Sequence, residues 1–355
     1  MSKSHPISDD DLTATREYFT LRADRYALCL RSYPFARILD LIPYCYFLRD
    51  AAARLGKRIG DLRVLDAFGG TGFLSYAFRH SGMQFTVADC CPAMLELGRN
   101  HADRVRWRET TNYFTRLAES EPETYDVILC HGGLHHVFAE TDGQVDHALA
   151  RQRQSLTIKN LSQLLVRKGT CIVSDIPASP PSNPFTGMDS QTVPNTTLLE
   201  VLGKDQVEEI HGLRIKPAAL SLAHLSDVIR HRFSSAAAHP VPRHFFDNFV
   251  SLETSLGHKA SFVPLNELDA MVRAASLEFS TRLDYLGPWL FPSRRAAGWF
   301  FREKFAYATS APIGDAPESE EHVSQRIEEQ LGSHEVGSDL FAVNWGVVYS
   351  VLVKN

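Results

Sequence analysis

The hydrophobic residues between positions 62 and 176 occur in short apolar runs separated by amphipathic stretches. Five runs have the length and the β-branched and aliphatic content of strands: Arg63–Ala67, Gln84–Asp89, Val105–Arg108, Asp126–Cys130 and Thr170–Ile176. The stretches between them predict helices at Phe73–Ser81, Pro92–Asn100 and His147–Val166. This alternation predicts an α/β domain whose parallel sheet is covered by helices on both faces.

Helices are predicted to precede the sheet, within residues 1–61. Asp9–Asp11 can cap a first helix. A second helix is predicted to begin near Pro34 and to end at Gly56, because proline suits the first turn of a helix and glycine its carboxyl end. Pro43 is expected to kink or interrupt this helix. We interpret the whole segment as a helical lid.

The alternation of strands and helices stops after Ile176. Residues 177–262 begin with a proline-rich stretch and continue with mixed helical segments, such as Leu198–Leu202 and Leu220–Arg230. We interpret them as an inserted, mostly helical cap that binds the acceptor.

The sheet pattern returns in residues 263–355, which are predicted to complete the sheet. They predict a helix at Leu265–Ala275, a strand at Leu277–Leu286 and a final strand at Phe341–Val353, whose alternate residues share one face. The acidic stretch at residues 315–339 is predicted to be a solvated loop with one short helix.

Composition narrows the class of protein. The chain has 355 residues, of which 44% are hydrophobic and 22% charged, and its net charge of −5 comes without a long Lys/Arg run. We therefore expect no nucleic-acid or membrane partner. The first 20 residues lack the pattern of a secretory signal, and six cysteines without C-x-x-C spacing are typical of reduced thiols. These features predict a cytoplasmic protein.

The strongest chemical signal is the segment Asp66-Ala67-Phe68-Gly69-Gly70-Thr71-Gly72, which follows the first predicted strand and leads into a helix. Glycines let a ligand approach the backbone where a Cβ atom would collide with it. The start of the helix supplies free N–H donors. The segment therefore predicts a ligand-binding loop.

A second signal is Asp89, at the end of the next predicted strand. A carboxylate at this position can accept hydrogen bonds from both hydroxyls of an adenosine ribose. A dinucleotide is disfavoured, because Gly70-Thr71-Gly72-Phe73-Leu74-Ser75 lacks the third glycine of G-x-G-x-x-G. The loop and the carboxylate together predict a nucleotide site of another kind.

With these residues the chain resembles the class I S-adenosylmethionine (SAM)-dependent methyltransferases over residues 62–176. Further matching segments are Cys90–Leu95, Tyr125–Leu129, Leu134–Val137 and Leu164–Gly169. The resemblance implies a Rossmann-like fold, with a seven-stranded, mostly parallel sheet whose last strand is antiparallel. It also implies SAM as the cofactor.

The resemblance implies a role for each matching residue. Asp66, Gly70 and Gly72 would hold the methionine part of SAM, and Asp89 would hold the ribose. The other implied cofactor residues are Phe68 and Gly69 in the loop, Cys90 beside the adenine, and His131 and Gly132 on the methionine side. Phe68 stands where the family usually has glycine. For the contact with the adenine amino group, Glu109, Thr111 and Asn112 all remain candidates.

Two residues of the first helix, Tyr18 and Arg22, are candidates for covering bound SAM, since an aromatic face suits a sulfonium cation and a guanidinium suits a carboxylate. Core packing is an equally good interpretation of the tyrosine.

The histidines after the fourth predicted strand are candidates for catalysis. Neutral imidazole can accept a proton near neutral pH, so His135 or His136 can serve as a general base. A metal is not expected, because Gly132-Gly133 interrupts any helix that would bring His131 and His135 to one side.

The predicted function is methyl transfer from SAM to a small-molecule acceptor, of the kind found in secondary metabolism. One alternative is attack at another sulfonium carbon, giving aminocarboxypropyl transfer or cyclisation of SAM with release of methylthioadenosine. The other alternative is a SAM-binding partner subunit without catalysis.

Overall fold

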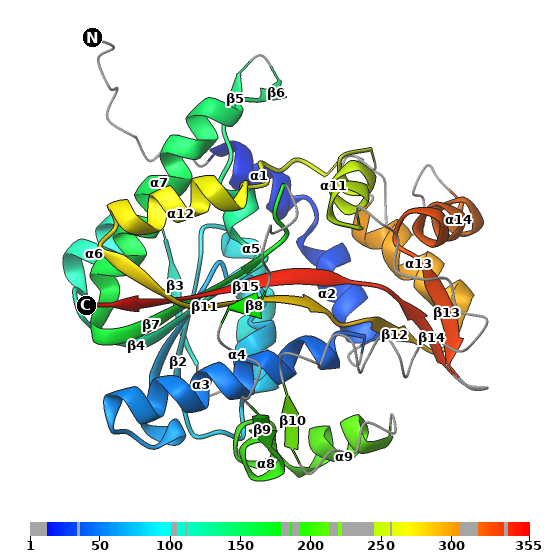
Figure 1. The fold of residues 1–355 in the computed structure, drawn as a ribbon. Helices are drawn as coiled ribbons and strands as arrows, with labels where there is room; N and C mark the ends of the chain where they lie inside the picture. Colours follow the sequence, from blue (N-terminus) through cyan, green and yellow to red (C-terminus); the bar gives the residue numbers. More distant parts are fainter. Residues whose placement is uncertain are drawn as a thin grey trace.

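The computed structural model describes the chain in twelve segments, and the following account is confined to them. They are residues 13–33, 36–100, 105–110, 112–141, 143–178, 185–186, 192–212, 219–221, 245–255, 258–305, 319–336 and 340–355. Their centre is an eight-stranded sheet with the order β3-β2-β1-β4-β7-β15-β11-β8 (Figure 1).

Five parallel strands form one half of this sheet, in the region where the sequence predicts five strands. They are β1 (Arg63–Ala67), β2 (Gln84–Asp89), β3 (Arg106–Glu109), β4 (Tyr125–His131) and β7 (Leu165–Asp175). The bounds of β1 and β2 agree with the prediction residue for residue. β4 is buried along six of its seven residues, as expected of a strand covered on both faces.

The other half contains the antiparallel strand that the resemblance implies. β15 (Gly346–Lys354) lies between β7 and β11 (Leu277–Leu286) and is antiparallel to both. The predicted sheet had seven strands, and the eighth is the two-residue β8 (Phe185–Thr186), which pairs with the outer edge of β11. The Rossmann-like methyltransferase topology is thereby confirmed.

Helices cover both faces of the sheet. On one face α7 (His147–Leu164) packs against α6 (Thr115–Ser120) and α12 (Leu265–Ala274), and on the other α3 (Leu41–Leu55) crosses β4 and β7 (Figure 1). Two short helices connect the first three strands: α4 (Phe73–Ala77) and α5 (Pro92–Arg99).

The segment before the sheet differs from its prediction in two places. It contains α1 (Thr13–Thr20), α2 (Ala23–Ser32) and the one-turn helices η2 (Ile38–Asp40) and η3 (Ile59–Asp61) besides α3. Gly56 ends α3 at a φ of 65°, as predicted, but α3 begins at Leu41 rather than near Pro34, which lies outside the described residues. Pro43 does not interrupt α3, because it occupies the first turn, where no backbone N–H is needed.

The inserted region is described only in part. It contains the helices α8 (Asn195–Leu202), α9 (Lys204–Gly212) and α11 (Phe245–Ser255), and the short strands β9 (Thr192–Pro194) and β10 (Ala219–Ser221). The helix predicted at 220–230 begins in β10, and its residues from 222 onward lie outside the described part.

The carboxyl-terminal region builds a second, three-stranded sheet, which the sequence did not predict. Its order is β12 (Trp289–Phe291), β14 (Leu340–Val343) and β13 (Ser333–Val336), with α13 (Arg294–Phe305) and α14 (Glu320–Gln330) beside it. The prediction of one strand over 341–353 is wrong, because Asn344 bonds to the backbone of Leu331 and Gly332 and separates β14 from β15. The acidic stretch contains β13 as well as its one helix.

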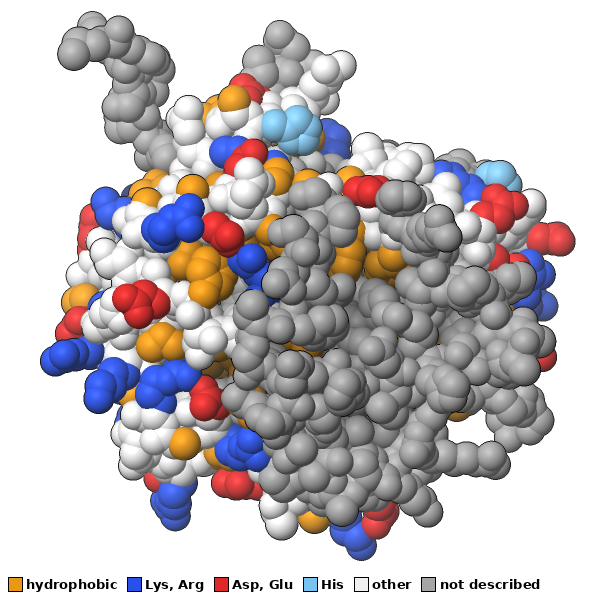
Figure 2. Space-filling model, in the orientation of Figure 1, with side chains coloured by type: hydrophobic (Ala, Val, Ile, Leu, Met, Phe, Trp, Pro, Cys, Tyr) orange, Lys and Arg blue, Asp and Glu red, His pale blue; other side chains and the backbone are white. Residues whose placement is uncertain are grey.

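The remaining small elements lie near the carboxyl ends of β3 and β4. They are η4 (Asn112–Phe114), η5 (Leu134–His136), β5 (Glu140–Thr141) and β6 (Gln144–Val145). Lys/Arg and Asp/Glu side chains are interspersed over the described surface in Figure 2. None of the described helices combines the length and apolar character that a bilayer crossing requires.

The packing of α5 predicts an unusual response to a glycine substitution. A Cβ atom on Gly98 would lie 2.3 Å from Trp107 and 2.8 Å from the carbonyl oxygen of Thr71 in the glycine loop. Gly98→Ala should therefore destabilise the protein by about 1–3 kcal/mol in chemical denaturation, although alanine favours a helix by ~1 kcal/mol. Adding Trp107→Leu to the Gly98→Ala variant should restore part of the lost stability. A Gly98→Ala variant that is more stable than the wild type would contradict this packing.

Candidate functional site

A pocket opens at the carboxyl ends of β1, β2 and β4, where ligands bind in open α/β sheets. Its empty space is about 1320 Å³, part of it open to solvent. Its lining comes from the loop after β1, the end of β2, η5, the chain after α11 and the carboxyl-terminal region. The pocket therefore joins segments from the whole length of the chain.

Asp89 fixes the glycine loop. Its carboxylate accepts hydrogen bonds from the backbone N–H groups of Gly70, at 2.9 Å, and Cys91, at 2.8 Å. Gly70 has a φ of 53°, a conformation that favours glycine. Burial raises the pKa of Asp89 to about 6, against the lowering effect of these backbone hydrogen bonds. The carboxylate and the loop thus form one unit on the pocket wall.

Asp66 is a second carboxyl group in the pocket lining; it is buried and lies near the end of the neighbouring strand β1. Burial and, to a lesser degree, the charge of Asp89 raise the pKa of Asp66 to about 8. Its Oδ2 atom is shielded from solvent and has no hydrogen-bond partner among the described residues. A ligand with a positive charge or a hydrogen-bond donor would give Oδ2 a partner and stabilise the ionised carboxylate.

Phe68 shows how the loop accommodates a side chain where the resembling family has glycine. Its φ is 59°, the left-handed conformation that explains the usual glycine. A Cβ atom on Gly133 would lie 2.6 Å from the Cβ of Phe68, so the absence of a side chain at Gly133 makes room for it. The ring packs edge-to-face on Phe114, with centroids 5.0 Å apart.

Residues 64–157 match the family model described as "Methyltransferase domain". The sheet order and the antiparallel β15 agree with this match. The comparison thus identifies a methyltransferase domain over residues 64–157. No curated protein matches the chain.

Several solved structures are similar to the chain at low identity. The [4+2]-cyclase SpnF is 13% identical, with a TM-score of 0.43, over 87% of this chain and 81% of that one. The YcgJ protein from Bacillus subtilis is 14% identical, with a TM-score of 0.42, over 90% and 98%. Geranyl diphosphate C-methyltransferase from Streptomyces coelicolor A3(2) is 13% identical, with a TM-score of 0.40, over 88% and 79%. At these values none of them indicates a reaction for this chain.

In the methyltransferase domain, most of the predicted cofactor residues line the pocket. They are Asp66, Phe68, Gly69, Gly70, Asp89, Cys90, His131 and Gly132. Gly72 does not line it; it precedes α4 and packs against Trp107. For the adenine amino group, Glu109 faces Arg16 in an ion pair at 3.0 Å, while Thr111 and the side chain of Asn112 lie outside the described part of the chain.

The structure places Tyr18 and Arg22 outside the pocket lining. Tyr18 is buried, and the guanidinium of Arg22 lies over its ring, 4.1 Å from the centroid. These surroundings agree with the other interpretation of Tyr18, which is that its ring packs in the core. Two other members of this amino-terminal segment, Phe19 and Tyr26, do line the pocket.

Arg37 lines the pocket and was not among the predicted residues. Its guanidinium bonds to Nε2 of His131, lies 3.4 Å from a carboxylate oxygen of Asp40 and covers the ring of Phe73, 4.4 Å from the centroid. Burial, followed by the charge of Arg37, lowers the pKa of His131 well below its usual value. The neutral ring therefore accepts at Nε2. No sequence motif marks Arg37, since it lies in an irregular stretch before η2.

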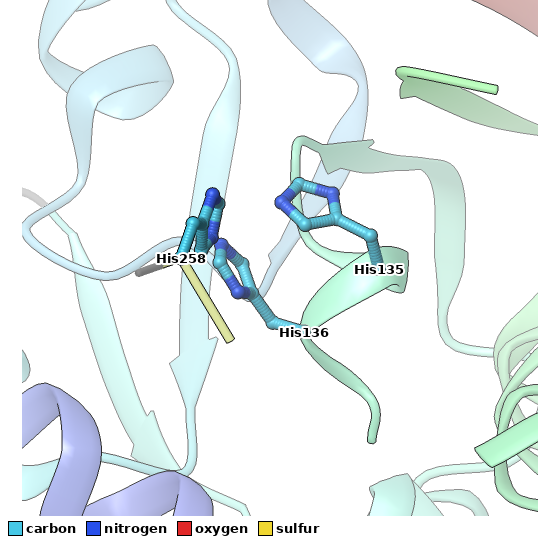
Figure 3. Close-up of side chains that lie close together, drawn as sticks. All are labelled: His135, His136 and His258. Atoms are coloured by element: carbon cyan, nitrogen blue, oxygen red, sulfur yellow. The ribbon is translucent and has the colours of Figure 1, made fainter. Parts of the chain in front are cut away.

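The predicted catalytic residues His135 and His136 lie in η5 and meet a third histidine, His258, which follows α11 (Figure 3). The centroid of the His136 ring lies 4.0 Å from that of His135 and 4.9 Å from that of His258. Burial lowers the pKa of His136 well below its usual value and also lowers that of His258. These two rings are therefore neutral at physiological pH.

Two carboxylates orient this histidine group. Asp175, at the end of β7, accepts from Nδ1 of His135 at 2.5 Å, and Glu253, in α11, bonds to Nδ1 of His258. Burial raises the pKa of Glu253, but the ammonium of Lys304 and the hydrogen bond with His258 outweigh it and lower the pKa to about 2. No sequence pattern marks His258, Glu253 or Lys304, because tertiary packing alone brings them to the pocket.

The raised pKa of Asp66 predicts a pH-dependent stability of the ligand-free protein. An unfolded aspartate ionises near pH 4, whereas folded Asp66 holds its proton until about pH 8, so stability is lost as the pH rises between these values. Asp66→Asn removes this loss. We expect the Tm of the variant, relative to wild type, to rise steadily between pH 5 and pH 8 in thermal unfolding. A Tm difference independent of pH would contradict the raised pKa.

Proposed function

We propose that this chain is a SAM-dependent methyltransferase that acts on a small-molecule acceptor. The observation that carries this proposal is that one pocket is lined both by Asp89 with the glycine loop that it fixes and by His135 and His136. Cofactor and acceptor would then meet within this pocket.

The cofactor orientation follows from the charges on the pocket wall. Asp89 would accept hydrogen bonds from the ribose hydroxyls, and Asp66 would face the ammonium group of the methionine part. Arg37 would bind the methionine carboxylate, the role that the sequence assigned to Arg22.

The reaction in this proposal is a direct, in-line transfer. A lone pair of the acceptor attacks the methyl carbon, the carbon–sulfur bond breaks, and sulfur keeps the electron pair as a neutral thioether. The product is S-adenosylhomocysteine, whereas attack on another sulfonium carbon leaves methylthioadenosine. His135 or His136 would accept a proton from the acceptor, or would hold a group that activates the acceptor.

The inserted region supports a small acceptor as the substrate class. Glu253 and His258 reach the pocket from this region, and Lys304, Trp289 and Trp345 reach it from the carboxyl-terminal part. This part of the pocket is thus lined partly by elements outside the matched residues 64–157, which suits a small metabolite better than a macromolecule.

Asp89 should be required for cofactor binding. We expect Asp89→Ala to weaken binding of S-adenosylhomocysteine by about 30-fold or more in calorimetry, since charged hydrogen bonds to the ribose are worth ~2 kcal/mol. Asp61→Ala is the matched control, because Asp61 is exposed and pairs with Arg58 at 2.8 Å. Unchanged affinity of a folded Asp89→Ala variant would contradict the proposal.

Arg37 should distinguish ligands that have a carboxylate from those that lack one. We expect Arg37→Met to weaken S-adenosylhomocysteine by about tenfold or more, as one lost charged hydrogen bond would. The affinity for methylthioadenosine, which lacks the amino-acid part, should change little. Both affinities are measured by calorimetry on the same protein, so a folding defect would lower both. Equal losses would overturn the assignment of Arg37 to the carboxylate.

A further inference from the structure

Three imidazole rings converge in the lining of the pocket. His135 and His136 are neighbours in η5, and His258 comes from the chain after α11, more than a hundred residues later. One nitrogen of each ring lies within 4.8 Å of the others (Figure 3). All three histidines line the pocket. The sequence-based prediction that no metal binds considered only His131, His135 and His136. It did not include His258, which completes this group.

Carboxylates hold two of the rings by the nitrogen that faces away from the group. Asp175 engages Nδ1 of His135, and its other oxygen accepts from the backbone N–H of the same residue at 3.1 Å. Glu253 engages Nδ1 of His258. Histidines that bind metal ions usually donate their second N–H in this way, which fixes the ring and leaves the lone pair of Nε2 for the ion.

The third ring has a nitrogen that the described residues leave unused. Nδ1 of His136 is shielded from solvent and has no hydrogen-bond partner among them. The ring is held edge-to-face by Phe19, with centroids 4.8 Å apart. A buried nitrogen without a hydrogen bond costs free energy, which a bound ion would recover.

We propose that His135, His136 and His258 form a binding site for one divalent transition-metal ion, such as Zn²⁺ or Fe²⁺. Three imidazole nitrogens suit these ions and do not suit Mg²⁺ or Ca²⁺, which prefer oxygen. Tetrahedral ligands at 2.0–2.1 Å lie about 3.3 Å from one another, so the nitrogens, which lie within 4.8 Å of one another, would move closer by up to about 1.5 Å to bind the ion. Asp175 and Glu253 add negative charge behind the site, which offsets the nearby ammonium of Lys304, 3.6 Å from Glu253.

The position of this site gives the ion a function. Three protein ligands leave a coordination position open, and all three line the pocket in which the acceptor would lie. An ion there would bind an oxygen of the acceptor and lower the pKa of its proton, which makes the oxygen or a neighbouring carbon a better nucleophile. This role rests on the proposed function, whereas metal binding itself does not. The substrate class that it favours is an acceptor with an oxygen beside the methylated atom.

The test uses the full-length protein, freed of metal with a chelator and titrated without any SAM analogue. We expect the wild type to bind one equivalent of Co²⁺, with ligand-field absorption typical of nitrogen ligands, and Zn²⁺ to displace it. Mg²⁺ should not compete. His136→Ala and His258→Ala should abolish the absorption, and Asp175→Asn should weaken binding by about tenfold, as expected for a residue that orients a ligand.

His80→Ala is the matched control, because His80 is an exposed histidine that does not line the pocket, and it should bind as the wild type does. Circular dichroism checks the fold of each variant, and His136→Asn and His258→Asn replace any alanine variant that unfolds. Failure of the folded wild type to bind Co²⁺ or Zn²⁺ would overturn the proposal, as would binding that survives both His136 and His258 substitutions. Binding of S-adenosylhomocysteine, measured separately, shows whether the proposed function stands in either case.

Discussion

Two carboxyl groups at adjacent strand ends, the buried Asp66 and the partly buried Asp89, are the constraint on which the rest of the pocket depends. They lie near the ends of β1 and β2, which are neighbours in the sheet, so both line the pocket. The fold satisfies Asp89 with backbone N–H groups of the glycine loop and leaves Asp66 with a raised pKa. Burial of these carboxyl groups therefore costs the ligand-free protein free energy, which a ligand with a positive charge and hydroxyl groups would recover. SAM has both properties.

The histidine part of the pocket lining has a different chemistry. There the rings of His136 and His258 are neutral, and carboxylates hold His135 and His258 from behind. The glycine loop and Asp89 belong to one short stretch of sequence, whereas the histidine part of the lining is assembled from η5, the inserted region and the carboxyl-terminal region. This division fits a domain with a common cofactor to which the rest of the chain adds a particular acceptor.

The sequence predicted what depends on local patterns. β1, β2 and β11 have the predicted bounds, and the glycine loop and Asp89 lie where the motif puts them, because both belong to one strand–loop–helix–strand unit. Arg37, Glu253 and His258 were missed because no spacing connects them with the motif. Their place in the pocket depends on how α11 and the segment before α3 pack on the sheet, which a single sequence does not reveal. The division of the last strand at Asn344 was missed for a similar reason, since its hydrogen bonds reach back to the chain after α14.

The most direct test of this account is a crystal structure of the full chain with S-adenosylhomocysteine and Zn²⁺. We expect the ribose on Asp89, the homocysteine carboxylate on Arg37, and the thioether sulfur facing an ion held by His135, His136 and His258. A ligand with its adenine at these histidines, or one bound outside this pocket, would contradict it.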